Sequence, residues 1–147
     1  MNDIIIRTGD EGEILSIAGG KYRILISGEE TGGNYAVIEM NVPPGGGPTP
    51  HAHPDMQEMF YVVEGEIEFR TESGKTRAGQ GGFINIPLGG GVHAFKNLSD
   101  QPAKLLCTVV PSGLEQMFKE VGGKSPEEVK EILKKYRQVV YPVDYLG

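Results

Sequence analysis

The sequence predicts an all-β protein with many tight turns, and two observations support this prediction. Of the 147 residues, 22 are glycine and 10 are proline, and the share of glycine is about twice the ~7% of an average protein. These residues are spread between short apolar runs, which recur at the roughly 8–12-residue spacing of a β-sandwich or β-barrel. The length suits one domain.

The strand candidates are short apolar runs, and turn residues separate them. Turn-forming residues stand at 64–65, 72–74 and 99–102. The segment Pro43–Pro50 is rich in proline and glycine, but strand candidates follow it, so we interpret it as a loop inside the domain. The candidates are Ile4–Arg7, Tyr22–Ser27, Tyr35–Val42, Met56–Val63, Glu66–Thr71, Gly82–Ile86, Val92–Asn97 and Ala103–Val110.

Two of these candidates show which face is expected to be buried. In Glu66–Thr71, the acidic residues alternate with Ile67 and Phe69, which predicts one solvated and one buried face. The candidate Ala103–Val110 is mostly apolar and contains Cys107, the single cysteine. We expect Cys107 to be a small buried hydrophobic residue.

The pattern changes after Pro111, where two short helices are expected. Residues 112–115 and 125–128 both have the sequence Ser-x-x-Glu, the capping box in which a hydroxyl and a carboxylate satisfy free amides at a helix start. We therefore expect a β-barrel over residues 1–111 and a helical extension over residues 112–147 that packs on it, within a single domain. The apolar faces expected to dock are Leu114, Met117, Phe118 and Val121, and Val129, Ile132, Leu133 and Tyr136.

Charge and hydropathy exclude several kinds of partner. The chain has 14 lysine and arginine residues against 20 acidic residues, a net charge of −6, so it repels phosphate backbones and we expect no nucleic-acid partner. No apolar run approaches the ~18–20 residues that span a bilayer. The first residues lack the charged start and apolar middle of a signal peptide. We therefore expect a cytoplasmic protein with no membrane partner.

All three histidines stand in a setting that suggests a metal site. His51 and His53 are two residues apart, so on an extended segment their side chains point the same way. Glu58 follows inside the next strand candidate, and His93 lies in a second glycine-rich segment. Imidazole suits Zn, Fe, Cu and Ni, and a carboxylate adds an anionic ligand. A single histidine is more often structural, but the set favours a divalent metal with positions open for water or substrate.

The spacing of these residues resembles a known family. Gly45, His51, His53, Glu58 and Gly65 match the first motif of the cupin superfamily at every spacing. The resemblance implies a small antiparallel jelly-roll barrel. It also implies one divalent transition metal per chain (Fe, Mn, Ni, Co, Cu or Zn), held inside by the two histidines, the glutamate and a third histidine.

A later segment is similar to the second cupin motif, with one departure. It contains Gly81, Pro87, His93 and Asn97, and the resemblance makes His93 the fourth metal ligand. The family pattern has one residue fewer between the proline and the histidine than this chain has. We expect a glycine bulge to absorb the extra residue and to leave His93 pointing inward.

Alternation along the strands predicts the wall of a substrate pocket. Because every second side chain of a strand shares a face, an inward Glu58 brings Phe60 and Val62 inward as well. An inward His93 does the same for Phe95. An apolar pocket beside an open metal site suits a small organic ligand.

Three functions remain open. The resemblance favours a metal-dependent dioxygenase of the quercetinase-like kind, acting on a small enolic or hydroxylated aromatic compound, with Glu58 as both ligand and catalytic base. The complete ligand set, the apolar pocket and residues 111–118, which resemble the helix after the barrel in that group, support it. One alternative is a non-enzymatic cupin that binds a small molecule. Another is a metal-dependent sugar or keto-acid isomerase or lyase, which needs lysine, arginine or tyrosine near the metal to hold anionic or hydroxyl groups, and the assigned positions do not obviously supply them.

The quaternary structure expected from the sequence is a homodimer. The strand candidate Ile4–Arg7 is short, apolar and outside the motif region. Pairing it with a neighbouring subunit would cover an otherwise exposed edge.

Overall fold

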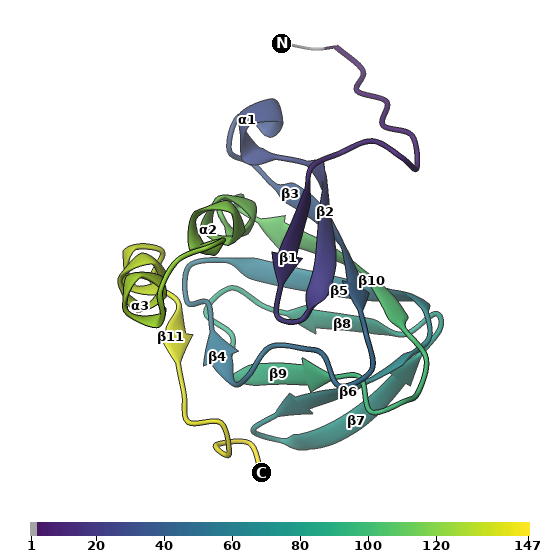
Figure 1. Ribbon diagram of the computed structural model, residues 1–147, viewed down its shortest axis with the longest axis vertical. Coiled ribbons are helices and arrows are strands. Elements are labelled where there is room, and N and C mark those ends of the chain that lie inside the picture. The colour runs from purple at the N-terminus through teal and green to yellow at the C-terminus, as the bar shows by residue number, and fades with distance from the viewer. Residues whose placement is uncertain (1–2) are drawn as a thin grey trace.

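Two antiparallel sheets face each other in the computed structural model, which describes residues 3–147 (Figure 1). The strand orders are β1-β2-β3-β10-β5-β8 and β11-β4-β9-β6-β7. The predicted all-β jelly-roll is confirmed, and within residues 3–147 no ladder closes the two sheets into a complete barrel. The first sheet contains β1 (Ile14–Ile17), β2 (Gly20–Ile26), β3 (Ala36–Val42), β5 (Gln57–Glu64), β8 (Phe83–Ile86) and β10 (Ala103–Val110). The second contains β4 (His51–Ala52), β6 (Glu66–Thr71), β7 (Gly74–Gly79), β9 (His93–Lys96) and β11 (Val139–Val140).

The core lies between the sheets and is built from alternate residues of their strands. Every second residue of β3 and β10 is buried, as expected for strands with one face on a core. Cys107 on β10 is fully buried and pairs with Ile38 and Phe60 on the neighbouring strands, so its predicted role as a core residue is confirmed. Phe60 packs against Phe69 and Phe95 of the other sheet, and its ring centroid lies 5.8 Å from the centroid of each.

The predicted strand Ile4–Arg7 is wrong for the isolated chain. This segment has no β-structure, and Ile4 and Ile6 are 89% and 80% exposed. A strand needs a partner, and the place beside β2 is taken by β1. Arg7 is held by an ion pair with Glu30 at 2.8 Å rather than by a ladder.

Four strands were not foreseen: β1, β4, β7 and β11. Strand β7 is polar and largely exposed, so it has no alternation to reveal it, and its pairing with β6 along six residues holds it in place. Strands β4 and β11 have only two residues each. Segments of this kind become strands because a neighbouring strand supplies the hydrogen bonds, which local sequence does not encode.

Three helices complete the fold: α1 (Gly28–Thr31), α2 (Leu114–Val121) and α3 (Pro126–Lys135). The two expected C-terminal helices are present. The capping box of α3 is confirmed, because Ser125 accepts a hydrogen bond from the Glu128 amide and the Glu128 carboxylate accepts one from the Ser125 amide. Helix α1 was not predicted, because one turn is too short to show a helical period.

Helix α2 begins differently from the prediction. Its N-cap is Gly113, with no side-chain cap hydrogen bond, so the predicted capping box at Ser112 is wrong. The Glu115 carboxylate is fully buried and accepts hydrogen bonds from the amides of Gly113 at 2.8 Å and Gly28 at 2.6 Å. A buried carboxylate is stabilised by such donors, and these two tie the start of α2 to α1.

The C-terminal segment covers one side of the sandwich (Figure 1). Phe118 of α2 packs edge-on against Tyr22 of β2, with ring centroids 5.4 Å apart. After α3 the chain enters β11, where Val140 pairs with His51 of β4. Residues 112–147 thus pack on the sheets and also add a strand to one of them. No helix within residues 3–147 is long and apolar enough to cross a membrane.

Candidate metal centre

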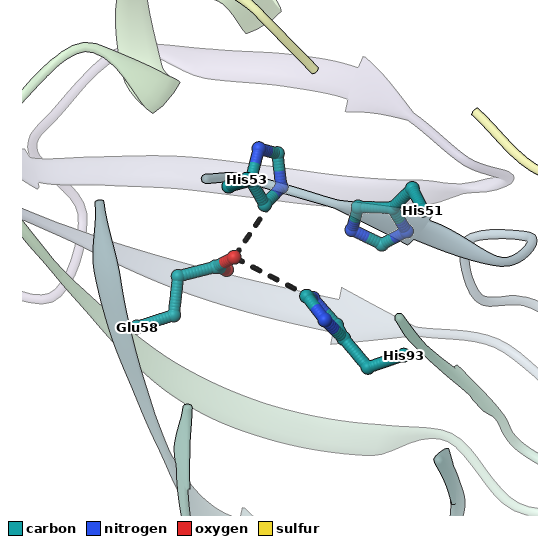
Figure 2. A group of neighbouring side chains, drawn as sticks. All are labelled: His51, His53, Glu58 and His93. Atoms are coloured by element: carbon teal, nitrogen blue, oxygen red, sulfur yellow. Dashed lines mark ion pairs between the residues drawn. The ribbon is translucent and has the colours of Figure 1, made fainter. Parts of the chain in front are cut away.

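Four side chains converge between the two sheets (Figure 2). His51 lies on β4 and His93 on β9, and these two residues are direct partners in the antiparallel ladder. His53 follows β4 by one residue, and Glu58 extends from β5 in the opposite sheet. Because His51 and His53 are separated by one residue in extended chain, both reach the same side. Residues far apart in sequence are thereby brought to one point.

The four side chains offer ligand atoms that all lie within 4.8 Å of one another. The Oε1 atom of Glu58 is 3.3 Å from Nε2 of His53 and 3.5 Å from Nε2 of His93. All four residues are buried, with Glu58 and His93 only 2% exposed. The sequence-predicted ligand residues therefore form one compact cluster.

Backbone carbonyls orient two of the imidazoles. Nδ1 of His51 lies 2.8 Å from the carbonyl oxygen of Thr49, and Nδ1 of His93 lies 3.0 Å from that of Gly91. A carbonyl oxygen only accepts, so Nδ1 carries the proton and donates it. The lone pair of each Nε2 then faces the cluster, which is the arrangement of a metal-ligating histidine with its outer hydrogen bond. Phe69 stacks parallel to His93, at 6.1 Å between centroids, and fixes its ring plane.

Burial keeps two histidines neutral, and interactions with the histidines keep the glutamate ionised at neutral pH. Desolvation, and then the neighbouring imidazoles, lower the pKa of His51 to about 3, and desolvation lowers the pKa of His53. Burial raises the pKa of Glu58, but stabilisation of the carboxylate by the imidazoles in their protonated form, with His93 contributing most, outweighs it, so the pKa of Glu58 lies below its usual range. Neutral imidazoles and an ionised carboxylate are the protonation states that bind a metal.

The cluster fits a divalent metal ion. Oε1 of Glu58 and Nε2 of His93 are buried and have no hydrogen-bond partner within residues 3–147. With Nδ1 of His93 protonated, its Nε2 lone pair faces Oε1 of Glu58 at 3.5 Å, an unfavourable contact that a cation between the two atoms would relieve. Three imidazoles and one carboxylate suit first-row transition metals and zinc.

A turn absorbs the extra residue before His93, so the predicted glycine bulge is wrong. The amide of Gly90 donates to the carbonyl of Pro87 at 2.8 Å, and Gly89 has a φ of 72°, as the third residue of a type II turn requires. A bulge needs a partner strand, whereas this loop connects β8 and β9, which belong to different sheets. His93 nevertheless points inward.

The loop that leads to the first two histidines is fixed by the second motif. Asn97 is fully buried, and its side-chain amide donates to the carbonyl of Val42 at 3.0 Å. The Asn97 backbone amide donates to the carbonyl of Gly46 at 3.0 Å. Gly47 lies so close to β9 that a Cβ would come within 2.0 Å of the Phe95 carbonyl oxygen. Only glycine allows this close approach, which sets the path of the loop into β4.

A cavity of about 350 Å³ opens beside the cluster, and Phe60 and Phe95 line it as expected. Val62 is fully buried but is not part of the cavity wall, so its predicted place in the pocket is wrong. It lies four positions beyond Glu58, about 14 Å along the strand at ~3.4 Å per residue. That distance takes it past the aromatic residues and into the closed core.

The C-terminal segment supplies the cavity wall that sequence reasoning missed. Met117 and Phe118 of α2, Leu133 of α3, and Gln138 and Val140 after α3 all line the cavity. The apolar faces of both helices were expected to dock on the sheets; part of each instead closes the cavity. Helical periodicity reveals such a face but does not distinguish packing on a sheet from covering a pocket. Among residues 3–147, none that lines the cavity is lysine or arginine.

Comparison with known families agrees with the geometry. The sequence profile of the cupin domain matches residues 38–109, which run from β3 into β10 and contain all four candidate ligands. Residues 38–109 of this chain are a cupin domain.

Two characterised relatives share the cupin region. Quercetin 2,3-dioxygenase from Bacillus subtilis is 27% identical over 112 residues, covering 76% of this cupin and 33% of that protein. This cupin therefore spans about a third of the length of that relative. Polyketide synthase CurC from Streptomyces cyaneus is 29% identical over 111 residues, covering 74% of this chain and 70% of the other.

Solved structures agree on the fold. KdgF from Halomonas sp. has a TM-score of 0.67 at 18% identity, covering 78% of this cupin and 99% of that chain. The polyketide cyclase RemF from Streptomyces resistomycificus has a TM-score of 0.63 at 24% identity, covering 76% of this cupin and 81% of that chain. At these identities the similarity establishes the shared architecture.

Proposed function

We propose that this cupin is a metal-dependent dioxygenase that acts on a small, neutral enolic or hydroxylated aromatic compound. The observation that supports it best is a buried His51, His53, Glu58 and His93 cluster at the wall of an apolar cavity. The Bacillus subtilis relative is named for the dioxygenation of quercetin, an aromatic enol.

The cavity wall favours a neutral substrate. An anionic sugar phosphate or keto acid needs a lysine or arginine to offset its charge, and the part of the chain that the structure describes places neither in the cavity lining. Its one ionised group, Glu58, repels an anion that is not paired with a metal. These features weigh against the isomerase or lyase alternative. The complete ligand set in turn favours catalysis over a cupin that only binds a ligand.

The chain's own residues can prepare such a substrate for oxidation. A divalent metal bound by the four ligands would supply a Lewis acid, the effect that lowers the pKa of water from 15.7 to ~7. Glu58, ionised at neutral pH, accepts the proton of the substrate's enol hydroxyl at Oε1. Phe60 and Phe95 hold the ring by apolar contact, and the residues of α2 and α3 exclude water from that side. The product of these steps is an electron-rich enolate in a dry pocket, which is the form that O2 oxidises.

Oxygen uptake tests this reaction. Protein loaded separately with Fe, Mn, Co, Ni or Cu is mixed with galangin, kaempferol and kojic acid in an oxygen electrode. We expect at least one metal form to consume O2 and enol in a 1:1 ratio, as incorporation of both oxygen atoms requires. Metal-free protein and His51→Ala serve as controls that consume neither. No uptake above these controls in any combination would overturn the dioxygenase.

A second candidate is the ring closure of a polyketide-like enol without O2. The relationship to polyketide synthase CurC, which extends over 70% of that protein, favours it, and the same apolar cavity accommodates it. In this case the enol is consumed at the same rate with and without O2. Turnover under argon therefore separates the two candidates.

We also propose a homodimer in which the N-terminal arm, residues 3–8, pairs with the other subunit. Ile4 and Ile6 are almost fully exposed in the single chain, and an extended apolar segment next to an edge strand readily adds to another sheet. Light scattering at micromolar concentration should give twice the 15.9 kDa chain mass. Deleting residues 1–8 should give a monomer. A full-length monomer, or a dimer that survives the deletion, contradicts the proposed pairing.

A further inference from the structure

The Gln138 side chain is held in the cavity wall by the way α3 ends. The amide of Gln138 donates to the carbonyl of Leu133 at 2.9 Å, and Arg137 has a left-handed φ of 59°. Together these features form a Schellman-type helix end, with an arginine at the position where glycine is usual. The uncommon conformation of Arg137 turns the chain from α3 into β11.

Pairing of β11 with β4 then places Gln138 beside the metal ligands. Val140 pairs with His51, and the next pair is Val139 with Ala52. Continuing this register by one residue sets Gln138 opposite His53. Alternation agrees, because Gln138 and Val140 line the cavity and Val139 does not.

The Gln138 amide has an unused acceptor in an apolar surrounding. Its Oε1 is buried and has no hydrogen-bond partner within residues 3–147, which costs free energy in the ligand-free protein. Apart from Gln138 and the four candidate ligands, the polar side chains that line the wall within the described residues are Thr49 and Tyr22. The last torsion of a glutamine is broad and shallow, so a small rotation can aim the acceptor at a ligand. A buried, unsatisfied polar atom at a binding site points to a partner that arrives with the ligand.

We propose that Gln138 positions the substrate by accepting a hydrogen bond from a hydroxyl that lies away from the enol itself. The substrate class is thereby narrowed to neutral enols that carry a further hydroxyl group. This inference rests on the proposed function, because it assumes that an enol occupies the cavity. Gln138 is a positioning residue, and the proton transfer to Glu58 does not require it.

Ligand binding and thermal stability test this role. Kojic acid and allomaltol have the same hydroxyl–carbonyl pair and differ by one distal hydroxyl. Each is titrated calorimetrically, without O2, into the Ni-loaded full-length protein. We expect wild type to bind kojic acid about tenfold more tightly than allomaltol, and Gln138→Leu to bind both with the affinity of allomaltol. Gln116→Leu, the same change on α2 outside the cavity wall, should keep the tenfold preference.

The ligand-free protein gives an independent readout. Replacing an unsatisfied amide by an apolar side chain removes a desolvation cost, so Gln138→Leu should raise Tm by roughly 2–4 °C. Gln138→Met, which keeps the unbranched shape, should do the same. A lower Tm in both variants would show a structural role for the amide and overturn the proposal.

The binding outcomes separate this inference from the proposed function. Equal affinity of wild type for both compounds, or a preference that persists in Gln138→Leu, would overturn the role of Gln138 and leave enol binding intact. No binding of either compound to Ni-loaded wild type would overturn both.

Discussion

His93→Ala should lose most of its bound metal, with affinity for a divalent ion reduced at least ~100-fold. Loss of even an outer hydrogen bond to a metal ligand costs ~10–100-fold in affinity, and here a ligand itself is removed. The site cannot compensate, because no other histidine, cysteine or acidic residue belongs to the cluster in the part of the chain that the structure describes. Wild type should purify with about one divalent ion per chain, measured by elemental analysis after dialysis. His51→Ala should behave in the same way.

Two comparisons make this result specific. Asn85→Ala, an exposed change on β8, should keep full metal content. Circular dichroism should show that His93→Ala retains the β-fold, because the aromatic core of Phe60, Phe69 and Phe95 does not depend on the metal. Full metal content in His93→Ala would show that this residue is not a ligand, despite its place in the cluster.

Glu58→Gln should keep part of its metal but lose about 10²–10⁴-fold in turnover, the usual contribution of general acid–base catalysis. The amide oxygen still coordinates weakly, so some metal remains. It accepts no proton at neutral pH, so the enol hydroxyl keeps its proton. Turnover is measured per metal-loaded chain, which separates lost chemistry from lost metal.

Glu64→Gln is the matched control, because this residue lies at the exposed end of the same strand. It should leave both metal content and turnover unchanged. If Glu58→Gln turned over like wild type per bound metal, Glu58 would be a ligand without a role as base.

Local sequence was enough to find the parts of this protein that depend on short-range periodicity. The alternation of β3 and β10, the capping box of Ser125 and the buried Cys107 follow from residues that are close together in the chain. The spacing from His51 to Glu58 is also a pattern of residues that are close together in the chain. An extended pair of histidines and a strand that begins a few residues later can place three side chains on one site wherever the rest of the chain lies.

Other features exist only because distant segments meet. Strand β7 has a polar sequence and is a strand because β6 pairs with it, while Ile4–Arg7 is apolar and finds no partner in the single chain. The Glu115 carboxylate accepts one hydrogen bond at the start of its own helix and a second from the amide of Gly28, which is far away in sequence. No local pattern records such contacts.

The sequence by itself determined the fold class and the identity of the four residues that meet at the candidate metal centre. Only the tertiary structure decided the shape and polarity of the cavity beside them. Its wall combines Phe60 and Phe95 with α2, α3 and Gln138, and it leaves out Val62. The physical reason is that periodicity fixes which way a side chain points. What that side chain then faces depends on how separate elements pack, and this is set by contacts across the whole chain.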